Sequence, residues 1–104
     1  MPSLSPGEEA AVAADLDPVI HAPARLRLMV VLTELPPGST MSFARLQELL
    51  GLTAGNLITH LRRLDDAGYV RTRKEGRLTT AQVTDQGRAA FATYRAALAA
   101  LLGD

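Results

Sequence analysis

The sequence predicts one mainly α-helical domain with a small β-hairpin. Four stretches between residues 24 and 102 carry apolar residues at helical spacing, whereas residues 69–83 have the pattern of two short strands around a glycine-containing turn. With 104 residues, the chain is long enough for a single modest core, but not for a catalytic domain plus a regulatory one. We therefore expect one functional unit.

Residues 1–16 are predicted to form an acidic N-terminal arm or a short helix, and residues 17–104 the main domain. Ser5-Pro6-Gly7-Glu8 has the form of a helix capping box with proline at the first helical position, and an alanine-rich run follows up to Leu16. A helix here would be an extra element that packs on a partner subunit. The arm is the favoured interpretation, because residues 1–7 have nothing to bury.

The first helix of the main domain is predicted at residues 24–35. Pro23 opens this helix, and Pro36-Pro37-Gly38-Ser39 ends it. Its apolar residues surround most of the circumference, which is more than one face of a small domain needs. We therefore expect part of this helix, including Leu28 and Val31, to contact a second subunit.

The next two predicted helices form a helix-turn-helix. Thr40-Met41 can supply a very short strand, Ser42 can cap a helix over residues 43–50, and Gly51-Leu52 then turns the chain into a second helix. In DNA-binding proteins, the first helix of such a pair braces the second and approaches the DNA backbone. Ser42 and Arg45 are thus candidate phosphate contacts, with simple solvation as the alternative.

The second helix, residues 53–68, is the candidate recognition helix. Thr53 can cap its start, and Gly68 can end it, because glycine enters the left-handed conformation without a Cβ penalty. On its exposed side, Asn56 could make a paired contact to adenine, and Arg63 could contact guanine or phosphate. An ordinary solvated face is the alternative. The apolar stripe contains Leu57, Leu61 and Leu64, and the opposite face contains Gly55, Asn56, Thr59 and Arg63.

A basic hairpin follows directly after this helix. Two strand-like runs, residues 69–74 and 78–83, flank the turn Glu75-Gly76-Arg77. The net charge is zero, with 11 basic and 11 acidic residues, but the first 20 residues hold four of the acids and no Lys or Arg. Basic residues outnumber acidic ones between residues 60 and 77. Such a local basic surface is what contact with phosphate requires.

The C-terminal helix is predicted over residues 85–102, with Thr84-Asp85 as its cap and Gly103 after its end. Large apolar residues repeat every three or four positions, and alanine fills most of the rest, which permits close approach of another helix. We favour a dimer seam, because the helix is long and the domain is small; packing back on its own domain is the alternative. The seam residues are Phe91, Tyr94, Leu98 and Leu101.

With these elements in this order, the chain resembles the winged helix-turn-helix transcriptional regulators, specifically the small MarR-like and ArsR-like group. The likeness covers residues 16–102 and implies a winged helix-turn-helix with a long C-terminal dimerisation helix. The turn at residues 75–77 is shorter than a typical wing of the group, which argues against deep insertion of its tip into the minor groove. The matching residues are Gly55-Asn56-Leu57, His60-Leu61, Leu64, Ala67-Gly68-Tyr69-Val70, Val83-Thr84 and Gly87-Arg88.

The two histidines are assigned structural roles. His21 is expected to be a packing or helix-end residue, because nothing nearby completes a ligand or catalytic site. His60 matches a histidine common in the resembled group, and it lies at the boundary between the buried stripe and the exposed face. Its simplest role is packing plus one hydrogen bond, and a direct base contact ranks second.

The composition argues against catalysis, a metal cofactor and a membrane location. Cysteine is absent, which excludes disulfides and thiolate metal sites and fits a reducing cytoplasm. The two histidines lie far apart in the sequence, and no phosphate-binding glycine loop is present. The sequence therefore shows no set of residues typical of a catalytic site. No apolar run approaches the roughly 20 residues of a membrane span, and the N-terminus lacks the regions of a signal peptide. We expect a cytoplasmic protein that is not an enzyme and needs no cofactor.

The favoured function is a homodimeric, sequence-specific binder of double-stranded DNA that regulates transcription, as a repressor. The alternative is a winged-helix module for protein contact, whose basic hairpin faces an acidic partner. The polar face of the recognition helix favours DNA. Any small-molecule effector would have to bind between helices of the dimer, and no polar cluster marks such a pocket. The predicted DNA-binding residues are Ser42, Arg45, Thr53, Gly55, Asn56, Thr59, His60, Arg62, Arg63, Arg73, Lys74 and Arg77.

Overall fold

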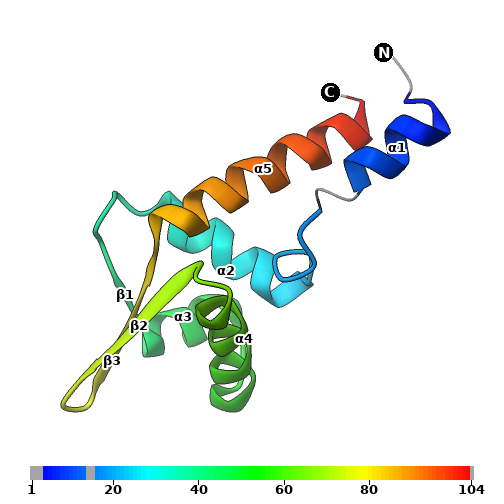
Figure 1. The fold of residues 1–104 in the computed structure, drawn as a ribbon. Coiled ribbons are helices and arrows are strands. Elements are labelled where there is room, and N and C mark those ends of the chain that lie inside the picture. Colours follow the sequence, from blue (N-terminus) through cyan, green and yellow to red (C-terminus); the bar gives the residue numbers. More distant parts are fainter. Residues whose placement is uncertain (1–3, 14–15, 104) are drawn as a thin grey trace.

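Five helices and a small sheet form the described part of the protein. The computed structural model describes residues 4–13 and 16–103, and none of the helices in these ranges is long and apolar enough to span a membrane. The mainly helical fold with a β-hairpin and a long C-terminal helix is confirmed (Figure 1). In chain order the elements are α1 (Pro6–Ala13), α2 (Pro23–Glu34), β1 (Met41–Ser42), α3 (Phe43–Leu50), α4 (Ala54–Asp66), β2 (Val70–Glu75), β3 (Leu78–Val83) and α5 (Asp85–Leu102).

The hairpin of β2 and β3 forms most of the sheet. The strand order is β1-β3-β2, and both strand pairs are antiparallel. Because Glu75 still pairs with Leu78, only Gly76 and Arg77 are left for the turn. Gly76 has φ +60°, the left-handed value that the first turn position of a type II′ hairpin requires. The wing is therefore as short as the sequence predicts.

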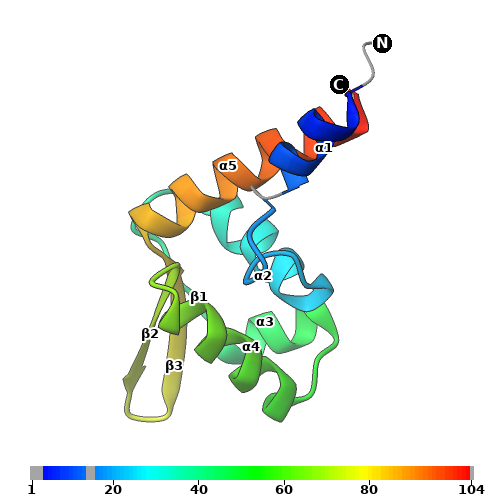
Figure 2. The ribbon, with the colours of Figure 1, turned by 45° about the vertical axis from the view of Figure 1, so that its right-hand side comes forward.

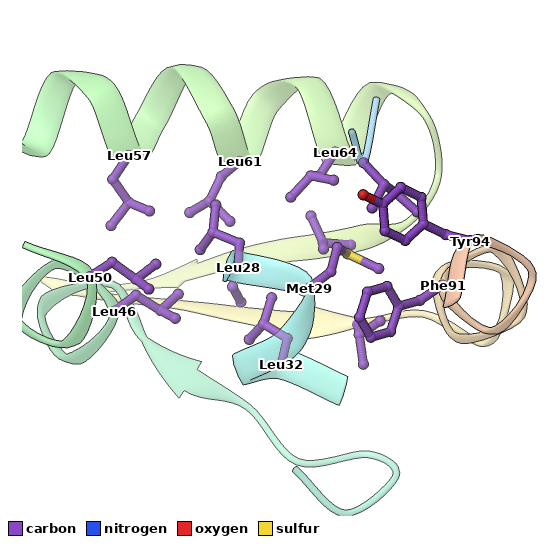
Figure 3. Close-up of a cluster of buried hydrophobic side chains, with 14 residues drawn as sticks. Leu28, Met29, Leu32, Leu46, Leu50, Leu57, Leu61, Leu64, Phe91 and Tyr94 are labelled. Atoms are coloured by element: carbon purple, nitrogen blue, oxygen red, sulfur yellow. The ribbon is translucent and has the colours of Figure 1, made fainter. Parts of the chain in front are cut away.

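The core lies where α2, α3, α4 and α5 meet the sheet. Figure 3 shows the leucines of α4 pointing toward α2, with the leucines of α3 at one end and the rings of α5 at the other. The helix α2 is central, because it contacts α3, α4, α5 and β3. Its wide apolar surface is therefore used largely within the chain. The buried core residues are Ile20, Leu28, Met29, Leu32, Leu46, Leu50, Leu57, Leu61, Leu64, Val70, Ala81, Val83, Phe91 and Tyr94.

This packing corrects part of the predicted subunit seam. Leu28 is 0% exposed, and Phe91 and Tyr94 are buried in the same cluster. Because the chain covers these three side chains itself, they offer a partner almost no surface. Val31 and Leu98 are only partly buried against the core. A seam through these two residues remains a prediction.

The helix α1 lies along the C-terminal half of α5, at the end of the molecule away from the hairpin turn (Figures 1 and 2). Its predicted capping box is present: Ser5 Oγ accepts from the Glu8 amide at 3.3 Å, and Glu8 Oε1 accepts from the Ser5 amide at 3.5 Å. Residues 6–13 therefore form a helix that packs on its own chain, and not the arm that the sequence favoured. Residues 1–3 and 14–15, which the predicted arm includes, lie outside the described residues.

The junction between the hairpin and α5 depends on Gly87 and Arg88. A Cβ atom on Gly87 would lie 2.1 Å from the carbonyl oxygen of Tyr69, so a side chain there requires the backbone to move. The guanidinium of Arg88 donates to the carbonyl oxygens of Thr33 and Leu35, at 3.0 and 2.8 Å. Since the last carbonyls of a helix lack partners within it, Arg88 stabilises the C-terminal end of α2.

Candidate nucleic-acid interface

The helix α4 is fixed by its cap and by its buried leucines. Thr53 Oγ1 accepts a hydrogen bond from the amide of Asn56 at 3.2 Å, as expected of an N-cap. Leu57, Leu61 and Leu64 are buried on the inner side of the helix. The opposite side is therefore held toward solvent in one orientation. The start of α4 and the hairpin turn lie at the same end of the molecule (Figures 1 and 2).

The outward side of α4 carries the predicted base-reading residues. Gly55, Asn56, Thr59, Arg62 and Arg63 are all exposed. Among the described residues, nothing bonds to the side-chain amide of Asn56, so the amide can both donate to and accept from a base edge. Thr59 Oγ1 donates to the carbonyl of Gly55 at 3.0 Å, which engages its only hydroxyl proton. Its oxygen and methyl group remain for external contact.

Gly55 has no packing reason to be glycine. A Cβ atom built on it would meet nothing within 4 Å among the described residues. Glycine inside a helix costs roughly 0.5–1 kcal/mol of stability relative to alanine. Glycine is typically used where another molecule must approach the backbone closely. We therefore expect close contact with DNA at this position.

His60 and Arg25 form a contact on the flank of α4. The two side chains approach at 3.3 Å between His60 Nδ1 and Arg25 Nη1. Arg25 also donates from Nε to the carbonyl of Val19. His60 is half-buried and makes one hydrogen bond, which is compatible with the role ranked first from the sequence. The sequence did not suggest the contact of Arg25 with His60, because the two residues lie 35 positions apart.

The hairpin presents the expected cations to solvent. Arg73, Lys74 and Arg77 are exposed. Arg73 lies 3.9 Å from Glu75, but the two side chains are 69% and 73% exposed, and such surface pairs contribute little to stability. No carboxylate of the described residues lies within ion-pair distance of Lys74 or Arg77. These charges are therefore available to phosphate groups.

The helix α3 carries the two remaining candidates. Ser42 Oγ accepts from the amide of Arg45 at 3.1 Å and so caps α3. The guanidinium of Arg45 pairs with Glu48 at 2.8 Å on the surface. Both residues retain donors for phosphate, but each also has a structural partner within the helix. Their DNA contact remains a prediction.

A hollow of about 320 Å³ separates α4 from the hairpin. Thr72 Oγ1 donates to Asp65 Oδ2 at 3.2 Å, which links β2 to α4 beside it. One apolar residue on this side, Ile58, was not singled out from the sequence, because it directly follows Leu57 and lies at the edge of the buried stripe. The residues around the hollow are Phe43, Ile58, Leu61, Arg62, Asp65, Asp66, Thr72 and Thr79.

The comparison with known proteins decides the family. A family model described as a winged helix DNA-binding domain matches residues 24–102, which include α2 to α5 and the hairpin. The chain belongs to this family. An uncharacterized protein of Methanocaldococcus jannaschii is 35% identical over 80 residues, covering 73% of this chain and 84% of that protein.

Solved structures agree with this assignment. The chain is similar to a transcriptional regulator homologue from Pyrococcus horikoshii OT3, with 26% identity and a TM-score of 0.80 over 90% of this chain and 95% of the other. It is also similar to a MarR family transcriptional regulator from Streptomyces coelicolor, with 26% identity and a TM-score of 0.71 over 88% and 64% of the two chains. The resemblance to MarR-like and ArsR-like regulators is confirmed. The protein is a DNA-binding transcriptional regulator with a winged helix.

Proposed function

We propose that two copies of this chain bind a specific pseudo-palindromic site in duplex DNA and repress transcription there. Each copy places the start of α4 in the major groove and its hairpin on the flanking phosphates. The observation that carries the proposal is the outward face of α4, where the Asn56 amide bonds to none of the described residues and Gly55 permits close approach. Because that face is polar rather than apolar, it favours DNA over a protein partner.

The helix order supports this docking. In helix-turn-helix proteins the second helix enters the major groove and its N-terminal residues contact base edges. In this chain α3 and α4 form the helix-turn-helix, so α4 is the second helix of the pair, and its first turn is exposed. Arg62 and Arg63 follow on the same helix, where they can contact guanine or phosphate. The hairpin adds Arg73, Lys74 and Arg77 as phosphate contacts.

The shape of the chain supports a dimer through α5. The molecule measures 53 × 26 × 22 Å. The C-terminal end of α5, together with α1, projects from the rest of the molecule (Figure 2). On that end Leu98 and Leu101 are half-buried, and Leu102 is 66% exposed. Exposed apolar residues that lie together on a surface mark a contact site for another molecule. A second copy of the chain is the partner we favour, because closed two-fold dimers are the commonest soluble oligomers.

Selection from a random duplex pool tests the proposal. A two-fold dimer places its two α4 helices roughly 34–36 Å apart, so the enriched site should have half-site centres about 10 base pairs apart. In a reporter assay, the enriched site placed over a promoter should lower transcription when the protein is present. Enrichment of a single unrepeated half-site would contradict the dimer. Enrichment of no sequence would contradict specific readout, and increased transcription would contradict repression.

A further inference from the structure

Ile58 is the one large apolar side chain of α4 that the chain leaves substantially uncovered. The three leucines of this helix are buried, whereas Ile58 is 46% exposed. Solvent exposure of an isoleucine brings no gain in helix stability, because β-branched side chains lose rotamer freedom in helices. Contacts within the chain therefore cover about half of this side chain, and the rest of it is free to contact another molecule.

The position of Ile58 places it on the candidate DNA interface. It lies three residues after Gly55 and four before Arg62, and residues at these separations are neighbours on a helix surface. Ile58 and Arg62 both border the hollow between α4 and the hairpin, together with the apolar side chains of Phe43 and Leu61. Duplex DNA that contacts the exposed start of α4 would therefore meet an apolar surface on this flank.

We propose that Ile58 contacts the C5 methyl group of a thymine in the major groove and so selects a T·A pair at one position of each half-site. The inference rests on the proposed sequence-specific binding by α4. Thymine is the only standard base with a methyl group at the major-groove edge, and apolar side chains recognise it by direct contact. Asn56 and the arginines read hydrogen-bonding edges, which Ile58 cannot do. Ile58 therefore adds an apolar contact to the hydrogen bonds by which the other residues recognise the base sequence.

Replacement of thymine by deoxyuridine tests this contact directly. The substitution removes only the methyl group and leaves every hydrogen-bonding edge intact. Starting from the duplex enriched by the wild-type protein, each thymine is replaced in turn and the Kd is measured at fixed salt. At one position per half-site, deoxyuridine should weaken wild-type binding about fourfold, which is what burial of one methyl-sized group contributes. Ile58→Ala should bind the thymine and deoxyuridine duplexes equally.

Two leucines of comparable exposure provide matched controls. Leu49 on α3 is 43% exposed and Leu78 beside the hairpin turn is 54% exposed, so Leu49→Ala and Leu78→Ala should keep the wild-type ratio of affinities. Ile58→Val should retain part of it. The ratio compares two duplexes on one protein, so a change in folding stability does not imitate the effect.

The outcomes separate this inference from the proposed function. If the pool yields no enriched sequence, the proposed specific binding fails. If a site is enriched but no deoxyuridine weakens wild-type binding, the role of Ile58 is overturned while specific binding stands. A ratio that is the same for Ile58→Ala and the wild type would overturn it as well.

Discussion

The phenol of Tyr69 donates a hydrogen bond to the carboxylate of Asp17, 52 residues earlier in the chain. The bond joins Asp17, in the segment before α2, to Tyr69, which lies between α4 and β2. It raises the pKa of Tyr69 from 10 to about 12, chiefly because the carboxylate holds the phenolic proton, with burial and the charge of Asp17 adding to the effect. The protonated phenol is thus part of the folded state.

This bond predicts a pH-dependent contribution to stability. A group whose pKa is raised on folding stabilises the fold fully below its unfolded pKa, and loses that effect as the pH rises through its folded pKa. Tyr69→Phe should lower the free energy of unfolding by about 1–2 kcal/mol near neutral pH. The difference from the wild type should stay constant up to about pH 10 and shrink between pH 10 and 12. Denaturant unfolding at several pH values measures this.

Asp17→Asn is the control for the same bond. It keeps an acceptor oxygen but removes the charge, so a spectrophotometric titration should show the pKa of Tyr69 falling toward 10. Tyr69→Phe serves to identify which of the two tyrosines titrates. A Tyr69→Phe deficit that does not shrink above pH 10 would show that the hydroxyl contributes through packing rather than through its proton.

Gly55→Ala should separate stability from DNA binding. Because a Cβ atom at this position meets nothing among the described residues, alanine should raise the free energy of unfolding by about 0.5–1 kcal/mol. The added methyl group should obstruct the close approach of DNA and weaken specific binding. Thermal unfolding and DNA titration of the same preparation measure the two effects. Higher stability with unchanged affinity would show that Gly55 does not face DNA.

The wing cations should contribute to affinity without contributing to sequence preference. Each change of Arg73, Lys74 or Arg77 to Ala should weaken binding similarly on all duplexes and reduce the slope of log affinity against log salt by about one unit. Arg73→Lys keeps the charge and should keep the slope. If Ala at these positions changes which site is preferred while the slope stays constant, the hairpin reads a groove instead of phosphate.

Double substitution of Leu98 and Leu101 by Asp should produce monomers. Both residues are half-buried on the α5 end that we assign to the subunit contact, so charges there should disrupt association. Because Leu98 also packs against the core, the variant should lose some stability as well. Light scattering gives the mass, and circular dichroism checks that helicity is retained. A wild-type protein that is monomeric at micromolar concentration would refute the dimer.

The elements of this fold were predictable because their signals are local. Thr53, Ser42 and Thr84 cap the helices that follow them, and the leucines of α4 repeat at helical spacing. The spacing that predicted a seam through Phe91 and Tyr94 also describes a helix packed on its own core, and both side chains are buried there. Which neighbour covers such a stripe depends on tertiary packing, which spacing alone does not specify.

Some contacts of the fold and of the candidate site could not be predicted for a related reason. The contact between Arg25 and His60 joins residues 35 positions apart, and that between Arg88 and Thr33 joins residues 55 positions apart. Neither pair leaves a periodic pattern in the sequence. The exposed polar residues of α4 were predictable, because a helix with one leucine stripe must expose the other side.

Binding of Asn56→Ala to the selected site tests the central claim, that α4 reads DNA sequence. Asn56 is exposed and its amide is unengaged within the described residues, so alanine should leave the fold and the non-specific affinity nearly unchanged. Specific affinity should fall by about 1–3 kcal/mol, and preference should relax at particular base pairs. Thr40→Ala, an exposed change in the loop before β1, should have no effect. If Asn56→Ala enriches the same site from a random pool with unchanged strength, α4 is not the recognition helix.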